Sequence, residues 1–273
     1  MPTSATPTPS ATGLPHHLGD GVHRLRLAGR RAVVKIGRGK PPGFFAAEAR
    51  GLHALRAAGA LRVPAVYAVE DAGIALEDLG AGRADAADWT KAGRDLARLH
   101  RCAGTRFGFD ADGWCGDHPQ DNTPDDDGFR FFAERRLLPQ GRMALDRGLL
   151  DRADLARLEA LCARLPELLP ARPPVLVHGD LWRGNLHVCA DGELALIDGG
   201  AVHYGWAEAD LAMLTLFGAP PGEFFVAYES EAGIDSGWRE RAALLNLYHL
   251  LNHLNLFGGG YLGAARSVLM RYA

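Results

Sequence analysis

The sequence has no long hydrophobic run and no strong excess of charge of either sign. Its 273 residues include no apolar stretch of eighteen or more, so we expect no transmembrane helix and no membrane partner. The formal charge is −3 at pH 7, and the cations are almost all arginines scattered along the chain. A nucleic-acid-binding protein concentrates basic residues on one face, so we expect no nucleic-acid partner.

Cysteine is also scarce. The four cysteines form no CxxC pair and no spacing typical of a zinc site: Cys102, Cys115, Cys162 and Cys189. We therefore expect no disulfide framework and a reducing, cytoplasmic location. Residues 1–13 lack the basic segment followed by an apolar one that marks a secretory signal. Pro, Ser, Thr and Ala dominate this stretch, which predicts a disordered tail.

The chain contains enough apolar residues for a sizeable core. Its mass of 29.3 kDa and its 47% of hydrophobic residues suit one large domain or two closely joined lobes. Residues 23–29 and 30–37 alternate as two strands of a hairpin, and residues 44–59 have one apolar helical face. Two further strands are predicted within residues 63–80. Residues 14–80 should therefore form a small lobe of antiparallel strands with one helix.

The pattern changes after Gly80. Helical periodicity then prevails, at residues 88–100, 128–140 and 151–169. Two short apolar runs, 175–178 and 193–198, interrupt the helices, and the remainder of the chain is predicted to be helical. We predict an α+β fold of two lobes, with a hinge near residues 77–82 and a larger, mainly helical lobe over residues 81–273.

One loop carries most of the chemistry in the sequence. The apolar run at residues 175–177 ends in HGDLWRGN, which separates Asp180 from Asn185 by four residues. In the protein-kinase catalytic loop, H-R-D-x-x-x-x-N, the aspartate accepts the proton of the substrate hydroxyl and the asparagine holds Mg²⁺. A lone aspartate after a strand is usually a turn residue. The order and spacing here favour a catalytic Asp180 and a metal-binding Asn185.

A second carboxylate follows the next apolar run. Asp198, at the end of LALID, stands where a kinase has its other metal-binding aspartate. Mg²⁺ prefers hard oxygen ligands, so Asp198 and Asn185 could hold it beside the phosphates of ATP. We expect His178 to brace the loop through hydrogen bonds. Asp210 could do the same, although a role at the start of a helix fits it nearly as well.

Phosphoryl transfer from ATP also requires particular residues in the first lobe. Lys35 lies in the strand pattern AVVKIG and is one of only three lysines in the chain. It resembles the kinase lysine that contacts the α- and β-phosphates, and Glu48 is placed on the predicted helix to orient it. Alone, Lys35 could equally be an edge-strand lysine and Glu48 an exposed helix residue. Gly19 and Gly21 offer a phosphate-covering turn, but they fall short of G-x-G-x-x-G.

The predicted hinge completes the nucleotide site. Glu77, Asp78 and Leu79 follow the fourth predicted strand, where the backbone of a connector can bind the edge of an adenine ring. An edge strand leading into a loop is the plainer alternative. No G-x-x-x-x-G-K-[ST] sequence occurs, which excludes a P-loop nucleotide-binding fold.

Two histidines near the C-terminus are one helical turn apart. His249 and His253 have the spacing of metal ligands, but no glutamate follows His249 as in H-E-x-x-H. A wall of the acceptor pocket or a hydrogen-bonded core pair is favoured over a metal site. The sequence assigns no role to Trp182 or Arg183.

Several stretches together resemble the fructosamine kinase (ketosamine kinase) family, a branch of the aminoglycoside phosphotransferase-like kinases. They cover residues 14–273 and include HGDLWRGN, YGWAEADLAML, FGFDADGWCGDHPQDN, FFAERRLLPQ and LYHLLNHLNLFGGGYLGAA. The resemblance implies a protein-kinase-like fold and ATP-dependent phosphorylation of a sugar hydroxyl, at carbon 3 of a ketose attached to an amine. Its implied substrates are ketosamines such as fructosamine or ribulosamine adducts, either small molecules or glycated protein amines. The phosphorylated product is unstable in that family, so deglycation of the amine follows.

The chain departs from the family pattern at two places. Gly199 and Gly200 follow Asp198 where the family has Pro-Ala, and glycine predicts a more mobile loop. After HPQDN the family has tryptophans, whereas this chain has TPDDDGFRFF, which leaves the preferred acceptor open. The carboxylates of residues 125–127 would suit the polycationic acceptor of an aminoglycoside- or choline-like kinase. A nucleotide-binding protein without turnover is a further alternative, favoured only by the weak glycine turn.

Overall fold

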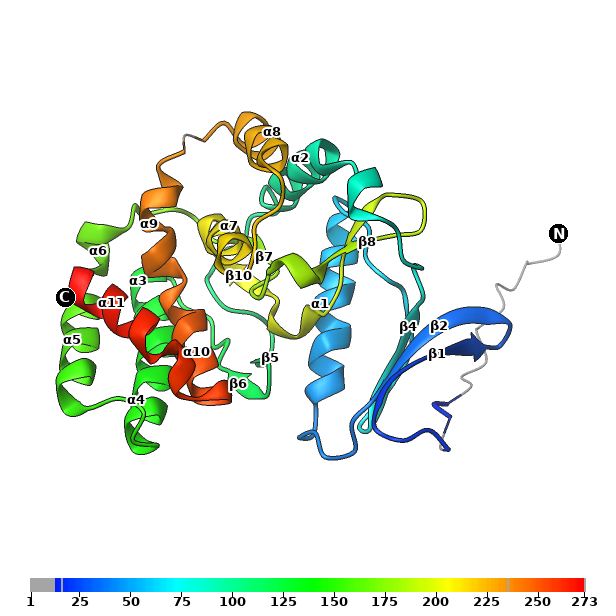
Figure 1. The fold of residues 1–273 in the computed structure, drawn as a ribbon, viewed down its shortest axis with the longest axis horizontal. Coiled ribbons are helices and arrows are strands. Elements are labelled where there is room, and N and C mark those ends of the chain that lie inside the picture. The colour runs from blue at the N-terminus through cyan, green and yellow to red at the C-terminus, as the bar shows by residue number, and fades with distance from the viewer. Residues whose placement is uncertain (1–12, 16, 235, 273) are drawn as a thin grey trace, which may run out of the picture.

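The structure, a computed structural model, describes residues 13–15, 17–234 and 236–272, so residues 1–12 of the predicted tail lie outside the described residues. Figure 1 shows a strand-rich lobe on one side and a helical lobe on the other. The small lobe has a four-stranded antiparallel sheet in the order β1-β2-β4-β3. Its elements are β1 (Gly21–Leu27), β2 (Arg30–Ile36), α1 (Phe44–Ala58), β3 (Val66–Glu70) and β4 (Gly73–Glu77). The predicted hairpin, helix and following pair of strands are therefore confirmed.

Strand β2 shows how the sequence orients the charged side chain of Lys35. Successive side chains of a strand point to opposite faces of the sheet. Val34 and Ile36 are buried in a small apolar cluster on one face, together with Leu14. Lys35 consequently lies on the other face, where its ammonium group reaches Glu48 of α1.

The large lobe is built mainly of helices. They are α2 (Trp89–Leu99), α3 (Gly128–Phe132), α4 (Leu138–Asp146), α5 (Arg152–Ala163), α6 (Leu165–Leu168), α7 (Ala207–Leu216), α8 (Gly222–Ala232), α9 (Trp238–Leu245), α10 (Leu247–Phe257) and α11 (Leu262–Tyr272). The three predicted helical stretches are present, but two of them are interrupted. A π-helical turn at Ala133–Leu137 separates α3 from α4, and α6 begins beside Pro166, which cannot continue the hydrogen bonds of α5.

Short strands in this lobe were not predicted in full. They form three antiparallel pairs: β5 (Gly113–Cys115) with β6 (His118–Gln120), β7 (Val175–Val177) with β10 (His203–Gly205), and β8 (Leu186–Val188) with β9 (Leu194–Leu196). The expectation that the chain is helical throughout after residue 198 is wrong at β10. Strands of three residues are too short to show an alternating pattern, so only their partners in the fold reveal them.

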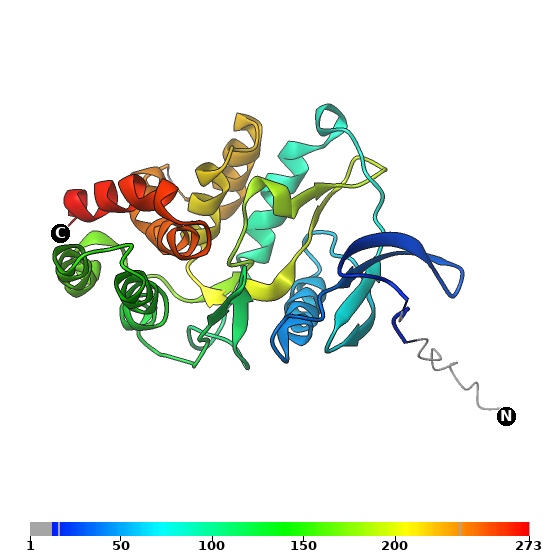
Figure 2. The same ribbon diagram turned by 60° about the horizontal axis from the view of Figure 1, so that its bottom comes forward.

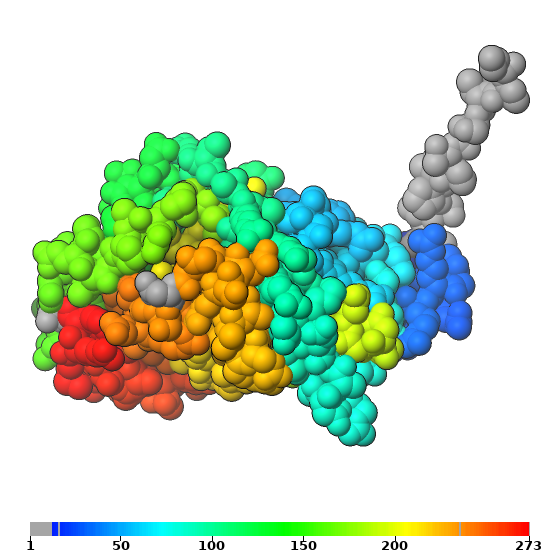
Figure 3. All heavy atoms as spheres, turned by 90° about the horizontal axis from the view of Figure 1, so that it is seen from above, coloured from blue at the N-terminus to red at the C-terminus, as the bar shows by residue number. Residues whose placement is uncertain are grey.

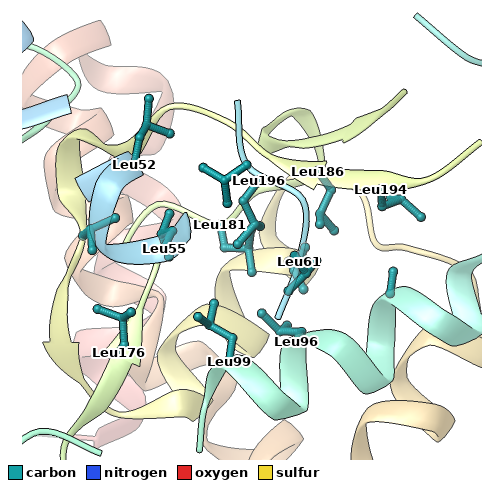
Figure 4. Close-up of a cluster of buried hydrophobic side chains, with 14 of the residues drawn as sticks. Leu52, Leu55, Leu61, Leu96, Leu99, Leu176, Leu181, Leu186, Leu194 and Leu196 are labelled. Atoms are coloured by element: carbon teal, nitrogen blue, oxygen red, sulfur yellow. The ribbon is translucent and has the colours of Figure 1, made fainter. Parts of the chain in front are cut away.

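A leucine cluster supports the loop that follows β7. Figure 4 shows leucines from distant segments packed together in this cluster. They are Leu52 and Leu55 of α1, Leu96 and Leu99 of α2, and Leu61, Leu176, Leu181, Leu186, Leu194 and Leu196. Leu181 belongs to the HGDLWRGN loop itself and is fully buried. Burial of a leucine side chain stabilises a structure by about 2–3 kcal/mol, so Leu181 anchors the loop to the core.

Two further views place the elements in space. Figure 2 shows the segment from β7 to β10 lying between the small lobe and the C-terminal helices. Figure 3 shows the β1–β2 hairpin and α11 at opposite ends of the molecule. Among the described residues, no helix combines the length and apolar character that a membrane crossing needs.

Candidate active site

The HGDLWRGN loop is closed by its own side chains. The Nδ2 group of Asn185 donates to the carbonyl oxygen of Asp180 at 2.8 Å, and the amide of Asn185 donates to the carbonyl of Trp182 at 2.9 Å. The amide of Ile197 donates to the carbonyl of Asn185 at 3.2 Å, which brings this loop beside Asp198. The two predicted metal ligands therefore come from adjacent backbone segments.

His178 and Asp210 hold this loop in place. Asp210 accepts from the backbone amides of His178 and Gly179, at 2.8 and 3.0 Å. The ring of His178 lies 2.8 Å from the carbonyl oxygen of Ile197 through Nε2. The loop is thus tied both to α7, which carries Asp210, and to the end of β9.

His100 and Tyr228 extend this support, and the sequence did not indicate either residue. Nε2 of His100 lies 3.3 Å from the Asp210 carboxylate, and its Nδ1 lies 2.7 Å from the Tyr228 hydroxyl. Burial alone would raise the pKa of Asp210, but its hydrogen bond with His100 and the backbone donors hold that pKa below its usual value. Asp210 therefore stays ionised and keeps both loop amides paired.

Lys35, Glu48 and Asp198 meet between the lobes. The ammonium of Lys35 lies 2.6 Å from Glu48 and 3.8 Å from Asp198. Burial lowers the pKa of Lys35, but the charges of Asp198 and Glu48 outweigh that effect and raise it above its ordinary value. Asp198 has a φ of 67°, a left-handed conformation that is uncommon for a residue other than glycine, and it immediately precedes the short turn at Gly199–Ala201.

A cleft of about 520 Å³ opens around this charged group. The predicted residues Lys35, Glu48, Gly21, Glu77, Asp78, Leu79 and Asp198 line it. Gly19 does not line the cleft, because it lies on the exposed turn before β1. His187 and Ile197 line it from the large lobe, and no sequence pattern had indicated them.

A lysine from the small lobe reaches across the opening. Lys40 lines the cleft, forms an ion pair with Asp117 of the β5–β6 turn, and lies over the ring of Phe44 at 4.7 Å. The two partners of this ion pair come from opposite lobes. No local pattern indicated this pair, because Lys40 and Asp117 are far apart along the chain.

The cleft continues into a chain of cavities. A middle cavity of about 120 Å³ shares Phe44, Glu48 and Asp198 with the 520 Å³ cleft. The same middle cavity shares Gly116 and Asp180 with a third cavity of about 460 Å³. Asp180 therefore lies where the middle and third cavities join, and Asp198 lies where the first and middle cavities join.

Aromatic residues form much of the third cavity. Its wall includes Trp182, Phe217, His253, Phe257 and Tyr261. Trp182 follows Asp180 by two residues and is 41% exposed, and Phe257 is 67% exposed. Such exposure of large apolar side chains around a concave site is typical of a binding surface.

The two C-terminal histidines do not face a common point. His253 bonds through Nδ1 to the carbonyl of His249 within their own helix, at 2.7 Å, and its ring contacts Phe217 at a centroid distance of 4.8 Å. His249 is buried, and its Nδ1 lies 3.8 Å from Asp180. Of the pair, only His253 lines the third cavity.

The surroundings of Asp180 favour a proton acceptor. Burial raises the pKa of Asp180 to about 6, while the charge of His178 opposes the shift and those of Asp198 and Asp210 add to it. A carboxylate with such a pKa is ionised at neutral pH, yet it binds a proton more readily than an exposed aspartate.

Arg183 and the aspartates of residues 125–127 make contacts within the protein that stabilise the fold. The guanidinium of Arg183 lies over the ring of Trp89, 4.4 Å from its centroid, and fixes the loop to α2. Asp125 pairs with Arg130, Asp126 pairs with Arg106, and Asp127 caps α3. None of these three aspartates lines the third cavity, which among the described residues has Asp180 as its one carboxylate.

The glycines after Asp198 allow a close approach to α1. A Cβ atom on Gly199 would lie 2.6 Å from the backbone nitrogen of Leu52, and one on Gly51 would lie 1.9 Å from the carbonyl oxygen of Gly199. Gly199–Ala201 form a short 3₁₀ turn against the helix that carries Glu48. The expectation of a mobile loop did not include this packing. The close approach to α1 therefore accounts for glycine at position 199.

Comparisons with known proteins agree with this geometry. The family model of the fructosamine kinases matches residues 19–273. A candidate ketoamine kinase from Synechocystis is 39% identical over 247 residues, which cover 88% of this chain and 82% of that protein. The chloroplastic protein-ribulosamine 3-kinase of Arabidopsis thaliana is 35% identical over 251 residues, 88% of this chain and 75% of that protein.

Solved structures give the same result. A candidate fructosamine-3-kinase from Thermobifida fusca superimposes with a TM-score of 0.83 at 37% identity, over 91% of this chain and 89% of that one. An aminoglycoside phosphotransferase bound to streptomycin and ATP superimposes with a TM-score of 0.60 at 14% identity, over 92% and 91%, which shows a shared fold. The predicted two-lobed, kinase-like fold is confirmed. From the match over residues 19–273 and these relatives, the chain belongs to the fructosamine kinase family.

Proposed function

We propose that this protein transfers the γ-phosphoryl group of ATP to a hydroxyl of a ketosamine sugar. The observation that carries the proposal is the row of three connected cavities, with Asp180 at the junction of the middle and third. ATP would occupy the largest cavity, its γ-phosphate the middle one, and the acceptor sugar the aromatic one. In phosphoryl transfer most of the catalysis comes from positioning and charge stabilisation, which such an arrangement supplies.

The small lobe would bind the nucleotide. Lys35, held by its 2.6 Å contact with Glu48, would contact the α- and β-phosphates. The connector Glu77–Leu79 would present its backbone to the adenine edge. Lys40 would lie near the phosphates from the edge of the cleft.

The oxygen donors at Asn185 and Asp198 fit a magnesium ion. Asp198 lines the middle cavity, and Asn185, which is buried and lines none of the three cavities, comes from the adjoining backbone segment. One carboxylate and one amide oxygen would form the hard, sparse donor set that Mg²⁺ takes from proteins. When bound, Mg²⁺ would neutralise charge on the phosphates. Asp198 would be shared between this ion and Lys35, which lies 3.8 Å away.

Asp180 would act as the base. As the sugar oxygen forms its bond to the γ-phosphorus, the hydroxyl proton passes to the Asp180 carboxylate, and the bond from phosphorus to the bridging oxygen breaks to release ADP. The raised pKa of Asp180, about 6, suits a group that accepts a proton near neutral pH. His178 and Asp210 would position the loop without touching the substrate.

The acceptor is inferred from the relatives and from the third cavity. Ketoamine and ribulosamine are the substrates that the relatives' names give, and we propose the 3-hydroxyl of such an adduct here. Phosphate beta to the ketone would then leave readily and free the amine, on a small molecule or a protein. Four cysteines without disulfides fit a cytoplasmic enzyme of this kind. A polycationic aminoglycoside is a poorer candidate acceptor, because the carboxylates of Asp125–Asp127 pair with arginines or cap α3 and do not line the third cavity.

The test is ADP release with Mg-ATP and a synthetic fructosamine or ribulosamine. Wild type should turn over only when the ketosamine is present, and Asp180→Asn should lower kcat by about 10²–10⁴-fold, the usual contribution of a general base. The matched control is Asp126→Asn, which removes an exposed carboxylate just before the start of α3. Wild-type protein that binds ATP yet shows no ketosamine-dependent turnover would exclude the proposal, and would favour a nucleotide-binding protein without catalysis.

A further inference from the structure

Three potential metal ligands of different chemistry converge beside the acceptor cavity. Cys115 of β5, Asp180 of the catalytic loop and His249 of α10 each offer one atom, and these atoms all lie within 4.8 Å of one another. The Sγ of Cys115 lies 4.0 Å from Nδ1 of His249, which is 3.8 Å from the Asp180 carboxylate. The sulfur–nitrogen contact is a long hydrogen bond, and the contact of His249 with Asp180 is longer than a hydrogen bond, so the three groups face one another without close pairing.

The separations are slightly larger than those of an occupied site. Zn²⁺ binds sulfur at about 2.3 Å and imidazole nitrogen at about 2.0 Å in tetrahedral geometry, which places two ligand atoms roughly 3.5 Å apart. On occupation the contacts of His249 with Cys115 and Asp180, now 4.0 and 3.8 Å, would shorten by about half an ångström, and the ligand atoms of Cys115 and Asp180, which lie within 4.8 Å of each other, would approach by up to about 1.3 Å. Asp180 can supply that movement, because its side chain is partly exposed and ends at the cavity.

The sulfur is oriented by a fixed donor. Nδ2 of Asn252 donates to Sγ of Cys115 at 3.2 Å and to the Cys115 carbonyl at 3.2 Å. Two further contacts fix the orientation of the Asn252 side chain. Its Oδ1 lies 2.7 Å from Nδ1 of His118 and accepts a hydrogen bond from Nε2 of Gln140 at 3.3 Å. Donors of this type stabilise a metal-bound thiolate and hold it in position.

The nitrogen and sulfur ligands are chemically suited to a thiophilic ion. Burial lowers the pKa of His249 to about 3, so its ring is neutral and can offer a lone pair. Burial and the charge of Asp180 raise the pKa of the Cys115 thiol, so binding of a metal would release the thiol proton to solvent. Access is open, because Cys115 and Asp180 both line the 460 Å³ cavity.

We propose that Cys115, Asp180 and His249 form a second metal site, for a thiophilic divalent cation such as Zn²⁺, and that its occupation blocks catalysis by capturing Asp180. A ligand from the cavity, water or a substrate hydroxyl, would complete the coordination. Mg²⁺ would not compete, because it prefers oxygen ligands and the site contains sulfur and imidazole. The blocking of catalysis rests on the proposed function, whereas metal binding does not.

Binding is tested on the full chain with Co²⁺ as a spectroscopic probe. Wild-type protein stripped of metal should develop the near-ultraviolet charge-transfer band of a cobalt–thiolate bond, and Zn²⁺ should displace it. Cys115→Ser should abolish the band while leaving the thermal unfolding of the metal-free protein near that of wild type. The matched control is Cys162→Ser in α5, a half-buried cysteine outside this cluster, which should retain the band. Absence of the band in wild type, or its persistence in Cys115→Ser, would overturn the site.

Inhibition is tested separately. Zn²⁺ is titrated against ketosamine-dependent ADP release at saturating Mg-ATP, with each variant normalised to its own zinc-free rate. Cys115→Ser should need at least tenfold more Zn²⁺ for half-inhibition than wild type and Cys162→Ser. If wild type, Cys115→Ser and Cys162→Ser are half-inhibited at the same Zn²⁺ concentration, Zn²⁺ inhibits at another site and the proposed capture of Asp180 is wrong. A Cys115-dependent cobalt band in a protein without turnover would retain the metal site and reject the proposed function instead.

Discussion

Replacement of Asp180 by asparagine should make the protein more stable while removing its activity. The pKa of this aspartate rises from 3.8 to about 6 on folding, chiefly because burial penalises the charged form. Each pKa unit corresponds to about 1.4 kcal/mol, so a shift of roughly two units sets an upper limit of about 3 kcal/mol. A quarter of the side chain is exposed, and solvent screening reduces the expected gain to about 1–2 kcal/mol.

The pH dependence of this gain has a definite sign. An aspartate whose folded-state pKa is raised favours folding when it is protonated and opposes folding when it is ionised. The gain in unfolding free energy of Asp180→Asn over wild type should therefore reach its full value above about pH 6. It should shrink as the pH falls from 6 towards 4, and vanish below 4, where the aspartate is protonated in both states.

Thermal unfolding of wild type and variant between pH 4 and pH 8 measures the effect. The experiment is done in EDTA without nucleotide, because ligands that bind the folded state would add their own stabilisation. A gain of 1–2 kcal/mol corresponds to a rise in Tm of roughly 2–6 °C for a chain of this size.

The control is Asp154→Asn, for which the sign is opposite. Burial alone would raise the pKa of Asp154, but Arg266 and the backbone of Asp151 hold it below its usual value. Loss of that carboxylate should lower Tm at neutral pH. If Asp180→Asn also unfolds at or below the wild-type temperature at pH 8, the argument from burial of the charge is wrong.

Four further results are expected. Trp182→Ala removes a wall of the acceptor cavity, so steady-state kinetics should show KM for the ketosamine rising about fivefold or more with kcat nearly unchanged. Lys35→Met leaves Glu48 without its cation, and kcat/KM for ATP should fall at least a hundredfold, whereas unchanged kinetics would remove Lys35 from the site. The pH profile of kcat/KM should lose about tenfold per unit below pH 6, because Asp180 must be ionised to accept a proton. Gly51→Ala places a methyl group 1.9 Å from a backbone oxygen of the 3₁₀ turn after Asp198, and urea unfolding should show a loss of about 1–3 kcal/mol.

Local patterns in the sequence determined the small lobe and the order of the residues proposed to be catalytic. The alternation around Lys35 and the helical period around Glu48 depend on neighbours within one strand or one turn, and both elements formed as predicted. The spacing of Asp180 and Asn185 is likewise a property of one short loop, closed by a hydrogen bond between them. Such features are encoded locally, so a single sequence is enough to find them.

Contacts between distant segments were decided only by the tertiary structure. Cys115 and His249 are separated by 134 positions, and the cysteines have no zinc spacing in the sequence, yet the packing of β5 against α10 brings the two side chains together. Lys40 and Asp117 meet for the same reason, across two lobes. Periodicity shows which face of an element is apolar, but it does not show which other element will cover that face. The residues proposed to hold the nucleotide and to accept the proton could therefore be named from the sequence, whereas the walls of the third cavity and the Cys115–Asp180–His249 cluster required the packed fold.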